Sequence, residues 1–169
     1  MRVALDRLYN AAGVLAALFL IGTLLMVLVG IAGRLLHFYV PGTDSYAGYC
    51  MAAAGFLALA HTLKHGEHIR VTLLIEHVGA KARRGLELWA LAAASVLAAA
   101  FAFYSVRLAY QSWQFNDIST GSDATPLWLP QITMAIGTVI LLIAFVDELL
   151  LEWKGARFMK APEKALHNE

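Results

Sequence analysis

Four long stretches of the chain contain no charged side chain, and they set the expected architecture. They cover residues 8–33, 45–63, 88–106 and 124–146, and are 26, 19, 19 and 23 residues long. An α-helix needs about 20 apolar residues to cross the roughly 30 Å hydrocarbon core of a bilayer, where it satisfies its own backbone hydrogen bonds. The pattern predicts four transmembrane helices, at about 9–33, 45–64, 87–107 and 126–150.

The composition agrees with an all-α membrane protein. Of the 169 residues, 60% are apolar and 15% are charged, which is far from the composition of a soluble domain. The segments outside the four stretches are too short for a separate globular domain with its own core. We therefore expect one integral membrane domain over residues 1–169 and exclude a soluble enzyme. The net charge of +1 gives no reason to expect nucleic acid as a partner.

Basic residues are distributed unevenly between the two sides of the predicted membrane. Because the number of spans is even, both termini and the loop between spans 2 and 3 fall on one side. That side carries eleven of the 13 Lys and Arg residues, and the other two loops carry only Arg34 and Arg107. Since positive residues concentrate in cytoplasmic segments, we expect both termini in the cytoplasm. The eleven residues are Arg2, Arg7, Lys64, Arg70, Lys81, Arg83, Arg84, Lys154, Arg157, Lys160 and Lys164.

The loop between spans 2 and 3 has a helical periodicity of its own. Apolar residues form one stripe over about 69–84, and the charged residues lie off that stripe. A segment of this kind, with too few apolar residues to span, lies in the headgroup plane. We expect an amphipathic interfacial helix here, with a solvated connector as the alternative. The stripe consists of Val71, Leu74, Ile75, Val78 and Ala82.

The third span contains an alanine at every fourth position. Ala90, Ala94, Ala98 and Ala102 would form a flat ridge on one helix face. In lipid, small residues allow close backbone approach, which holds helices together through van der Waals contact. The ridge is therefore a candidate interface, either within the protein's own bundle or with another subunit.

The start of the fourth span allows two interpretations. Asp123 followed by Pro126 resembles a capped helix start with proline at the first helical position. Alternatively, the helix begins at Pro130. Both interpretations give a bent or staggered entrance to the span.

The interiors of the spans contain little that could couple transport to an ion. Their charge-free stretches hold no Asp, Glu, Lys or Arg, and mid-span polar groups are limited to residues such as Thr23 and Ser95. Transporters keep ionisable or broken-helix sites near the bilayer midplane for this purpose. The single cysteine, Cys50, cannot form an intrachain disulfide, and no catalytic, cofactor or metal site is expected in the chain. The chain therefore has the features of a supporting subunit.

Three histidines suggest an alternative function. His61, His65 and His68 follow one another at helical spacing, as ligands of a metal or haem would. A haem-binding membrane anchor of a respiratory oxidoreductase is the alternative that they indicate. Haem in a four-helix bundle needs ligands on facing helices, however, and the other three spans contain no histidine.

Two motifs resemble those of a known family. The stretch 55–71 ends in Gly66-Glu67-His68-Ile69-Arg70-Val71, and Pro126-Leu127-Trp128-Leu129-Pro130-Gln131 precedes the last span. Both are similar to the small membrane subunit of tripartite ATP-independent periplasmic (TRAP) transporters, the DctQ family. Many members carry a tryptophan and paired glutamates just before span 2, whereas this chain has Asp44 as the acid there.

The resemblance implies partners in a bacterial inner membrane. It implies a large permease subunit that carries substrate by an elevator motion, driven by a sodium gradient, with the small subunit enlarging the static scaffold. Sodium is then expected in the partner subunit, and a periplasmic substrate-binding protein would deliver an organic acid. Gly66, His68 and Arg70 become candidate motif residues at the inner interface, beside membrane lipids. Candidate contacts of the periplasmic receptor are Asp44, Asp117 and Asp123.

Overall fold

Four long helices form the part of the chain that the computed structural model describes, residues 2–38, 40–65 and 80–154. They are α1 (Arg2–Leu35), α2 (Thr43–His65), α4 (Ala80–Gln114) and α5 (Trp128–Trp153). Each is long and apolar enough to cross a membrane, which confirms the four predicted spans. These described residues contain no strand, only an isolated bridge between Ile118 and Pro126.

Two of the helices are much longer than the predicted spans. α1 has 34 residues and α4 has 35. At 1.5 Å per residue each is about 50 Å long, whereas the hydrocarbon core is about 30 Å thick. Residues 80–84, the end of the predicted interfacial helix, form the start of α4, and the rest of that prediction lies outside the described residues.

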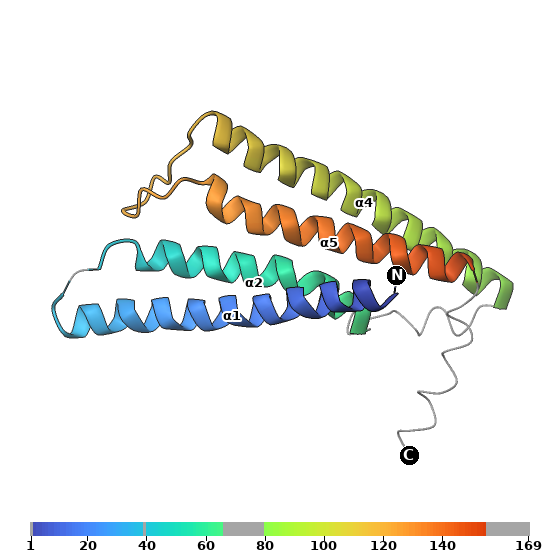
Figure 1. Ribbon diagram of the computed structural model, residues 1–169, viewed down its shortest axis with the longest axis horizontal. Helices are drawn as coiled ribbons and strands as arrows, with labels where there is room; N and C mark the ends of the chain where they lie inside the picture. Colours follow the sequence, from blue (N-terminus) through green and yellow to red (C-terminus); the bar gives the residue numbers. More distant parts are fainter. Residues whose placement is uncertain (1, 39, 66–79, 155–169) are drawn as a thin grey trace, which may run out of the picture.

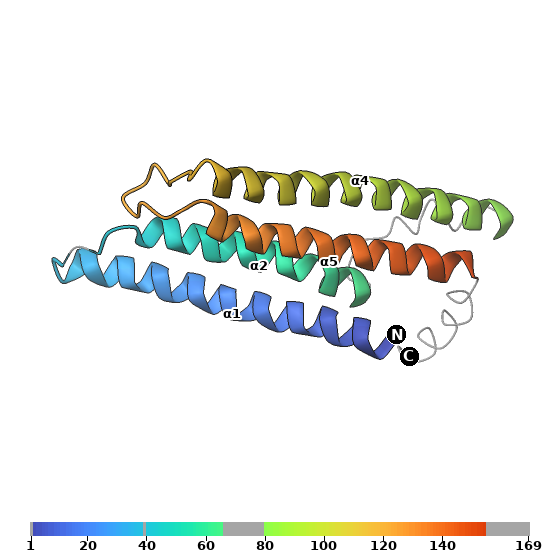
Figure 2. The same ribbon diagram turned by 45° about the horizontal axis from the view of Figure 1, so that its top comes forward.

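The helices lie side by side in the order α1, α2, α5, α4 (Figure 1, Figure 2). α1 packs against α2, α4 packs against α5, and α2 packs against α5 to join the two hairpins. The N-terminus and the end of α5 lie at one end of the molecule, which we call the termini end. The two hairpin connections, residues 36–42 and 115–127, lie at the opposite end, which we call the loop end.

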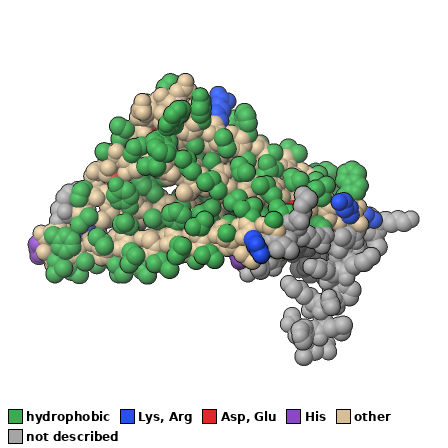
Figure 3. Space-filling model, viewed as in Figure 1, with side chains coloured by type: hydrophobic (Ala, Val, Ile, Leu, Met, Phe, Trp, Pro, Cys, Tyr) green, Lys and Arg blue, Asp and Glu red, His purple; other side chains and the backbone are tan. Residues whose placement is uncertain are grey.

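Small side chains form most of the interior. One buried cluster near the termini end joins three helices. It consists of Tyr9 and Ala12 of α1, Ala60 of α2, and Ile140 and Ala144 of α5. Large apolar side chains instead cover the outside, as Figure 3 shows for one face. Because lipid removes most of the hydrophobic drive between helices, close packing of small residues holds such a bundle together.

The fourth span begins later than one interpretation of its prolines predicted. α5 starts at Trp128, and the residue before it, Leu127, makes no capping hydrogen bond through its side chain. The expected cap at Asp123 is therefore not formed. Pro130 lies in the first turn, where a missing N–H costs no intrahelical hydrogen bond.

Candidate functional site

A charged contact joins α2 to α5 at the termini end. Nζ of Lys64 lies 2.8 Å from Oδ2 of Asp147 and 3.4 Å from Oε1 of Glu148. The three side chains are 23%, 20% and 11% exposed, so they are largely shielded from solvent. Nζ of Lys64 also lies 5.6 Å from the ring centroid of Tyr9 in α1, within the range of cation–π attraction. These four residues, the lysine clamp, connect three helices.

Two glycines allow neighbouring helices to approach closely. A Cβ atom at Gly137 of α5 would lie 2.6 Å from the backbone oxygen of Phe56 in α2. A Cβ atom at Gly13 of α1 would lie 2.8 Å from Nδ1 of His61 in α2. Both distances are below 3.0 Å, a separation that real Cβ atoms essentially never show. At Gly137 the near atoms are backbone, so glycine is required for α2 and α5 to keep their spacing, whereas at Gly13 the His61 side chain would have to move.

A hydrogen-bond network around Asp123 joins the hairpins at the loop end. Oδ2 of Asp123 accepts hydrogen bonds from the Tyr49 hydroxyl at 3.0 Å and the Thr125 backbone N–H at 3.4 Å. Oδ1 accepts a hydrogen bond from the Ser119 hydroxyl at 3.0 Å. Because Tyr49 belongs to α2, the carboxylate fixes the α4–α5 connection against the first hairpin.

The same network lowers the pKa of the Asp123 carboxyl well below its ordinary value of 3.8. Hydrogen bonding by Thr125 has the largest effect and outweighs the opposing effect of burial. Ser119 and Tyr49 stabilise the charged form further. The Asp123 side chain is therefore an ionised structural acceptor at neutral pH.

The polar contacts that join helices gather at the two ends, and the middle of the layer is mostly apolar with a few hydroxyls. The described ranges contain no group of three or more His, Cys, Asp or Glu side chains placed to hold a metal ion. In mid-span, the hydroxyls of Thr23, Ser95 and Thr138 are bonded to backbone carbonyls of their own helices. The arrangement can fix helices relative to one another and present its two ends to partners.

Comparison of the amino-acid sequence with known protein families identifies the family of this chain. Residues 23–155 match the family described as tripartite ATP-independent periplasmic transporters, DctQ component. The chain belongs to the DctQ family. Comparison with individual curated proteins gives no match. The protein is thus a small permease subunit of a TRAP transporter, a multi-pass inner-membrane protein and not an enzyme.

In this DctQ subunit the predicted alanine ridge is partly inside its own helix layer. Ala98 and Ala102 are 5% and 4% exposed, and they lie on the face of α4 that also buries Ser95. Ala94 is half-buried, and Ala90 is exposed. α4 packs against α5, so the buried half of the ridge serves the subunit's own fold, and its use as an interface with another subunit stays a prediction.

The three acids predicted to meet a receptor differ in their surroundings. Asp44, in the first turn of α2, is exposed and forms an ion pair of 3.3 Å with Arg34. Asp117 is exposed in the α4–α5 connection. Asp123 is half-buried and its carboxylate is engaged by the network described above. Asp44 and Asp117 are therefore the better placed of the three for a contact from outside, and receptor contact stays a prediction for all of them.

Most of the remaining candidate residues lie outside the part of the chain that the structure describes. Gly66, His68 and Arg70 fall outside the described residues, as does the side chain of His65. His61 is half-buried on α2 beside Gly13 of α1. The DctQ assignment gives no support to the alternative of a haem-binding anchor.

Sequence reasoning overlooked the residues that connect the helices of this DctQ protein. Lys64 and Asp147 directly follow the charge-free stretches 45–63 and 124–146, and both stretches end on the same predicted side of the membrane. Gly137 is one small residue in a long apolar stretch, and nothing local distinguishes it. The shared side was a usable signal for the lysine clamp, whereas the crossing at Gly137 needed the relative position of two helices.

Proposed function

We propose that this DctQ subunit is the static framework of a sodium-coupled TRAP transporter. A large permease subunit moves its substrate domain against this framework and holds the sodium ions. A periplasmic receptor delivers the substrate, an organic acid, to the two membrane subunits. The observation that carries the proposal is the division of the molecule into an apolar interior and two polar ends that join separate helices.

A framework must resist relative movement of its own helices, and the contacts described above supply that resistance. The lysine clamp connects α1, α2 and α5 at the termini end, and the Asp123 network connects the two hairpins at the loop end. Between these ends, the backbone of α2 lies directly against Gly137 of α5. A helix pair held at both ends and in the middle is suited to remain fixed while a neighbour moves.

The orientation of the framework follows from charge. The eleven basic residues on the side of the termini favour a cytoplasmic termini end, so the loop end would face the periplasm. Single-cysteine variants in a Cys50→Ser background test this directly. Asn116→Cys in the α4–α5 connection should react with a membrane-impermeant maleimide in whole cells, whereas Lys154→Cys, an exposed position just after α5 at the termini end, should react only after lysis. The opposite labelling pattern would reverse the proposed orientation.

Reconstitution separates a framework subunit from an independent carrier. Liposomes would contain this subunit alone, the large permease subunit alone, or both, with the receptor added outside. Uptake of labelled succinate and sialic acid would be measured with and without an inward sodium gradient. We expect uptake only with both membrane subunits, receptor and gradient. Uptake by this subunit alone would refute the framework role, and gradient-independent uptake by the full set would refute sodium coupling.

The receptor contact is tested by reversing exposed charges at the loop end. Asp44→Lys and Asp117→Lys should reduce receptor-dependent uptake while leaving co-purification with the large subunit unchanged. Asp6→Lys, an exposed acid near the termini end, is the matched control and should have no effect. Full uptake by the Asp44→Lys/Asp117→Lys double variant would remove these acids from the receptor contact.

A further inference from the structure

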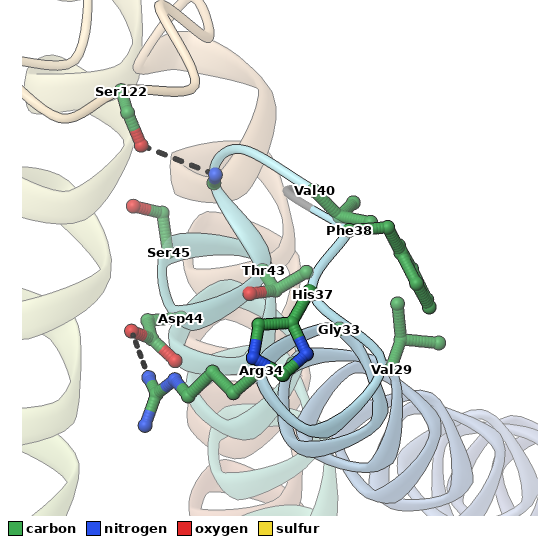
Figure 4. Close-up of a pocket in the computed structure, with 12 residues that line it drawn as sticks. Val29, Gly33, Arg34, His37, Phe38, Val40, Thr43, Asp44, Ser45 and Ser122 are labelled. Carbon is green, nitrogen blue, oxygen red and sulfur yellow. Dashed lines mark hydrogen bonds and ion pairs between the residues drawn. The ribbon is translucent and has the colours of Figure 1, made fainter.

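A cavity of about 340 Å³ opens at the loop end, beside the last turns of α1 (Figure 4). Its walls come from four segments that are separate in sequence: the end of α1, the 36–42 connection, the first turn of α2, and Ser122 of the α4–α5 connection. The volume lies in the range of sites that hold small molecules or their headgroups. The DctQ assignment does not use this cavity, and of its lining residues only Asp44 enters the proposed function, as a receptor contact.

The walls of the cavity are fixed by backbone contacts. The N–H of Phe38 donates a hydrogen bond to the carbonyl of Gly33 at 3.0 Å, and a Cβ atom at Gly33 would lie only 2.9 Å from the oxygen of Phe38. The N–H of Gly42 donates to the Ser122 hydroxyl at 3.1 Å, and Gly42 has a φ of +78°. His37 has a φ of +57°, which is uncommon for a residue with a side chain. The folded loop therefore presents a preformed cavity.

Opposite charges stand side by side in this cavity. The Arg34 guanidinium donates a hydrogen bond to Oδ2 of Asp44 at 3.3 Å, and the two side chains are 75% and 85% exposed. An ion pair this exposed is held weakly, so each partner remains available to an external group. The imidazole of His37 and the hydroxyl of Thr43 also line the cavity (Figure 4). The lining thus offers a donor fork for an anion and a carboxylate for a cation.

The other side of the cavity is apolar. Val29, Phe38 and Val40 lie together along it, away from the Arg34–Asp44 pair (Figure 4). Below it, toward the middle of the membrane, α1 exposes aliphatic side chains such as Leu24 and Leu28. The cavity therefore stands where the apolar surface of α1 gives way to polar groups, which is the depth of lipid headgroups.

We propose that this cavity binds the headgroup of a zwitterionic aminophospholipid such as phosphatidylethanolamine. The phosphate accepts hydrogen bonds from the Arg34 guanidinium, whose fork matches phosphate oxygens, and the primary ammonium donates to the Asp44 carboxylate. The glycerol carbons lie against Val29 and Phe38, and the acyl chains follow the aliphatic surface of α1. A choline headgroup has no N–H to donate to Asp44, and a phosphatidylglycerol headgroup has no cation for it.

Native mass spectrometry of the purified full-length subunit tests this proposal. The probes are the palmitoyl-oleoyl lipids with ethanolamine, choline and glycerol headgroups, each titrated into the same detergent. We expect the ethanolamine lipid to bind at least about tenfold more tightly than the other two, because the choline headgroup lacks the N–H donor for Asp44 and the glycerol headgroup lacks the positive charge that pairs with it. Free phosphoethanolamine, added as a competitor, should displace the lipid only weakly, because it lacks the acyl chains that follow α1.

Variants of the pair locate the binding. Arg34→Gln should weaken binding of the ethanolamine lipid, and Asp44→Asn should remove its preference over the choline lipid, each by about tenfold. Arg107→Gln and Asp117→Asn remove exposed charges outside the cavity and should change neither value. Equal binding of the three lipids, or unchanged selectivity in Asp44→Asn, would overturn the proposal. Binding of phosphatidylglycerol as tight as that of the ethanolamine lipid, lost in Arg34→Gln alone, would also overturn it in favour of a simple anion site. Arg34→Lys, which keeps the charge without the fork, serves if Arg34→Gln does not fold.

Discussion

Adding one methyl group at Gly137 should separate the two hairpins of this DctQ subunit. The new Cβ atom would lie 2.6 Å from the backbone oxygen and 2.7 Å from the backbone carbon of Phe56. Real Cβ contacts essentially never fall below 3.0 Å and ordinary van der Waals contact begins at 3.4 Å, so the local distance must grow by at least 0.4 Å, and by 0.8 Å to reach ordinary contact. Neither atom belongs to a flexible side chain, and therefore α2 and α5 themselves must shift.

The expected loss of stability follows from two opposing effects. Overpacking a tight interface costs about 1–3 kcal/mol, whereas replacing glycine by alanine within a helix gains up to about 1 kcal/mol. A gap of this size also forfeits a quarter to a half of the dispersion attraction of the atoms that separate. We expect Gly137→Ala to lower the free energy of unfolding by about 1–2 kcal/mol, and Tm by about 2–8 °C.

The matched control is a glycine beside the same crossing. Gly55 lies next to Phe56 on α2, and a Cβ atom there would meet nothing within 4 Å. Gly55→Ala should leave Tm unchanged or raise it slightly, because only the helix propensity changes. Thermal unfolding of both variants and the wild type would be followed by intrinsic fluorescence in one detergent. A Tm for Gly137→Ala equal to or above that of Gly55→Ala would refute the close crossing of α2 and α5.

Three further changes test the two ends and the ridge. Lys64→Met should lower the free energy of unfolding, measured by chemical denaturation, by about 1–3 kcal/mol, which lies between the values for exposed and buried ion pairs. The double variant Lys64→Asp/Asp147→Lys, which exchanges the two charges, should recover part of this loss. No recovery would argue against a direct contact. Because the folded-state pKa of Asp123 is lowered, the Asp123 carboxylate stabilises the loop end fully above pH 3.8, and this stabilisation is lost as the pH falls from 3.8 toward the lower pKa. Proteolysis of the 115–127 connection should therefore increase below pH 3.8. The Asp123→Asn variant should be cut readily even at neutral pH. Equal cleavage of the wild type and Asp123→Asn at neutral pH would exclude this role. Ala98→Leu should cost about 1–3 kcal/mol by overpacking against α5, whereas Ala99→Leu on the exposed face should have no effect, and equal Tm values for the two would remove Ala98 from the interface.

The number of spans could be predicted because desolvation of charge is a strong and local signal. A charged residue within the hydrocarbon core is costly, so the charge-free stretches identify α1, α2, α4 and α5 directly. The absence of charge does not specify where each helix begins and ends. α4 continues through Arg84 at one end and Arg107 at the other, because backbone hydrogen bonding does not stop where the hydrocarbon ends.

The start of α5 shows why capping patterns can mislead. Asp123 has the residue type and the spacing of a helix cap. In the structure its carboxylate is instead held by Tyr49, 74 positions earlier in the chain, together with Ser119. A local pattern cannot report this arrangement, because one of the partners, Tyr49, comes from another hairpin. The candidate site at the loop end consequently required the tertiary structure.

The division of the layer into two sequential hairpins has a consequence for biogenesis. Among the four described helices, every extensive contact except that between α2 and α5 joins neighbours in the chain. Each hairpin can therefore insert into the bilayer during synthesis, and its two helices can pair with each other at that stage. The two hairpins then associate through the α2–α5 interface, the α2–α5 seam, in a separate assembly step. A substitution that weakens the α2–α5 seam should leave both hairpins inserted with normal topology. The subunit with two unassociated hairpins is then the species that membrane quality-control proteases would encounter.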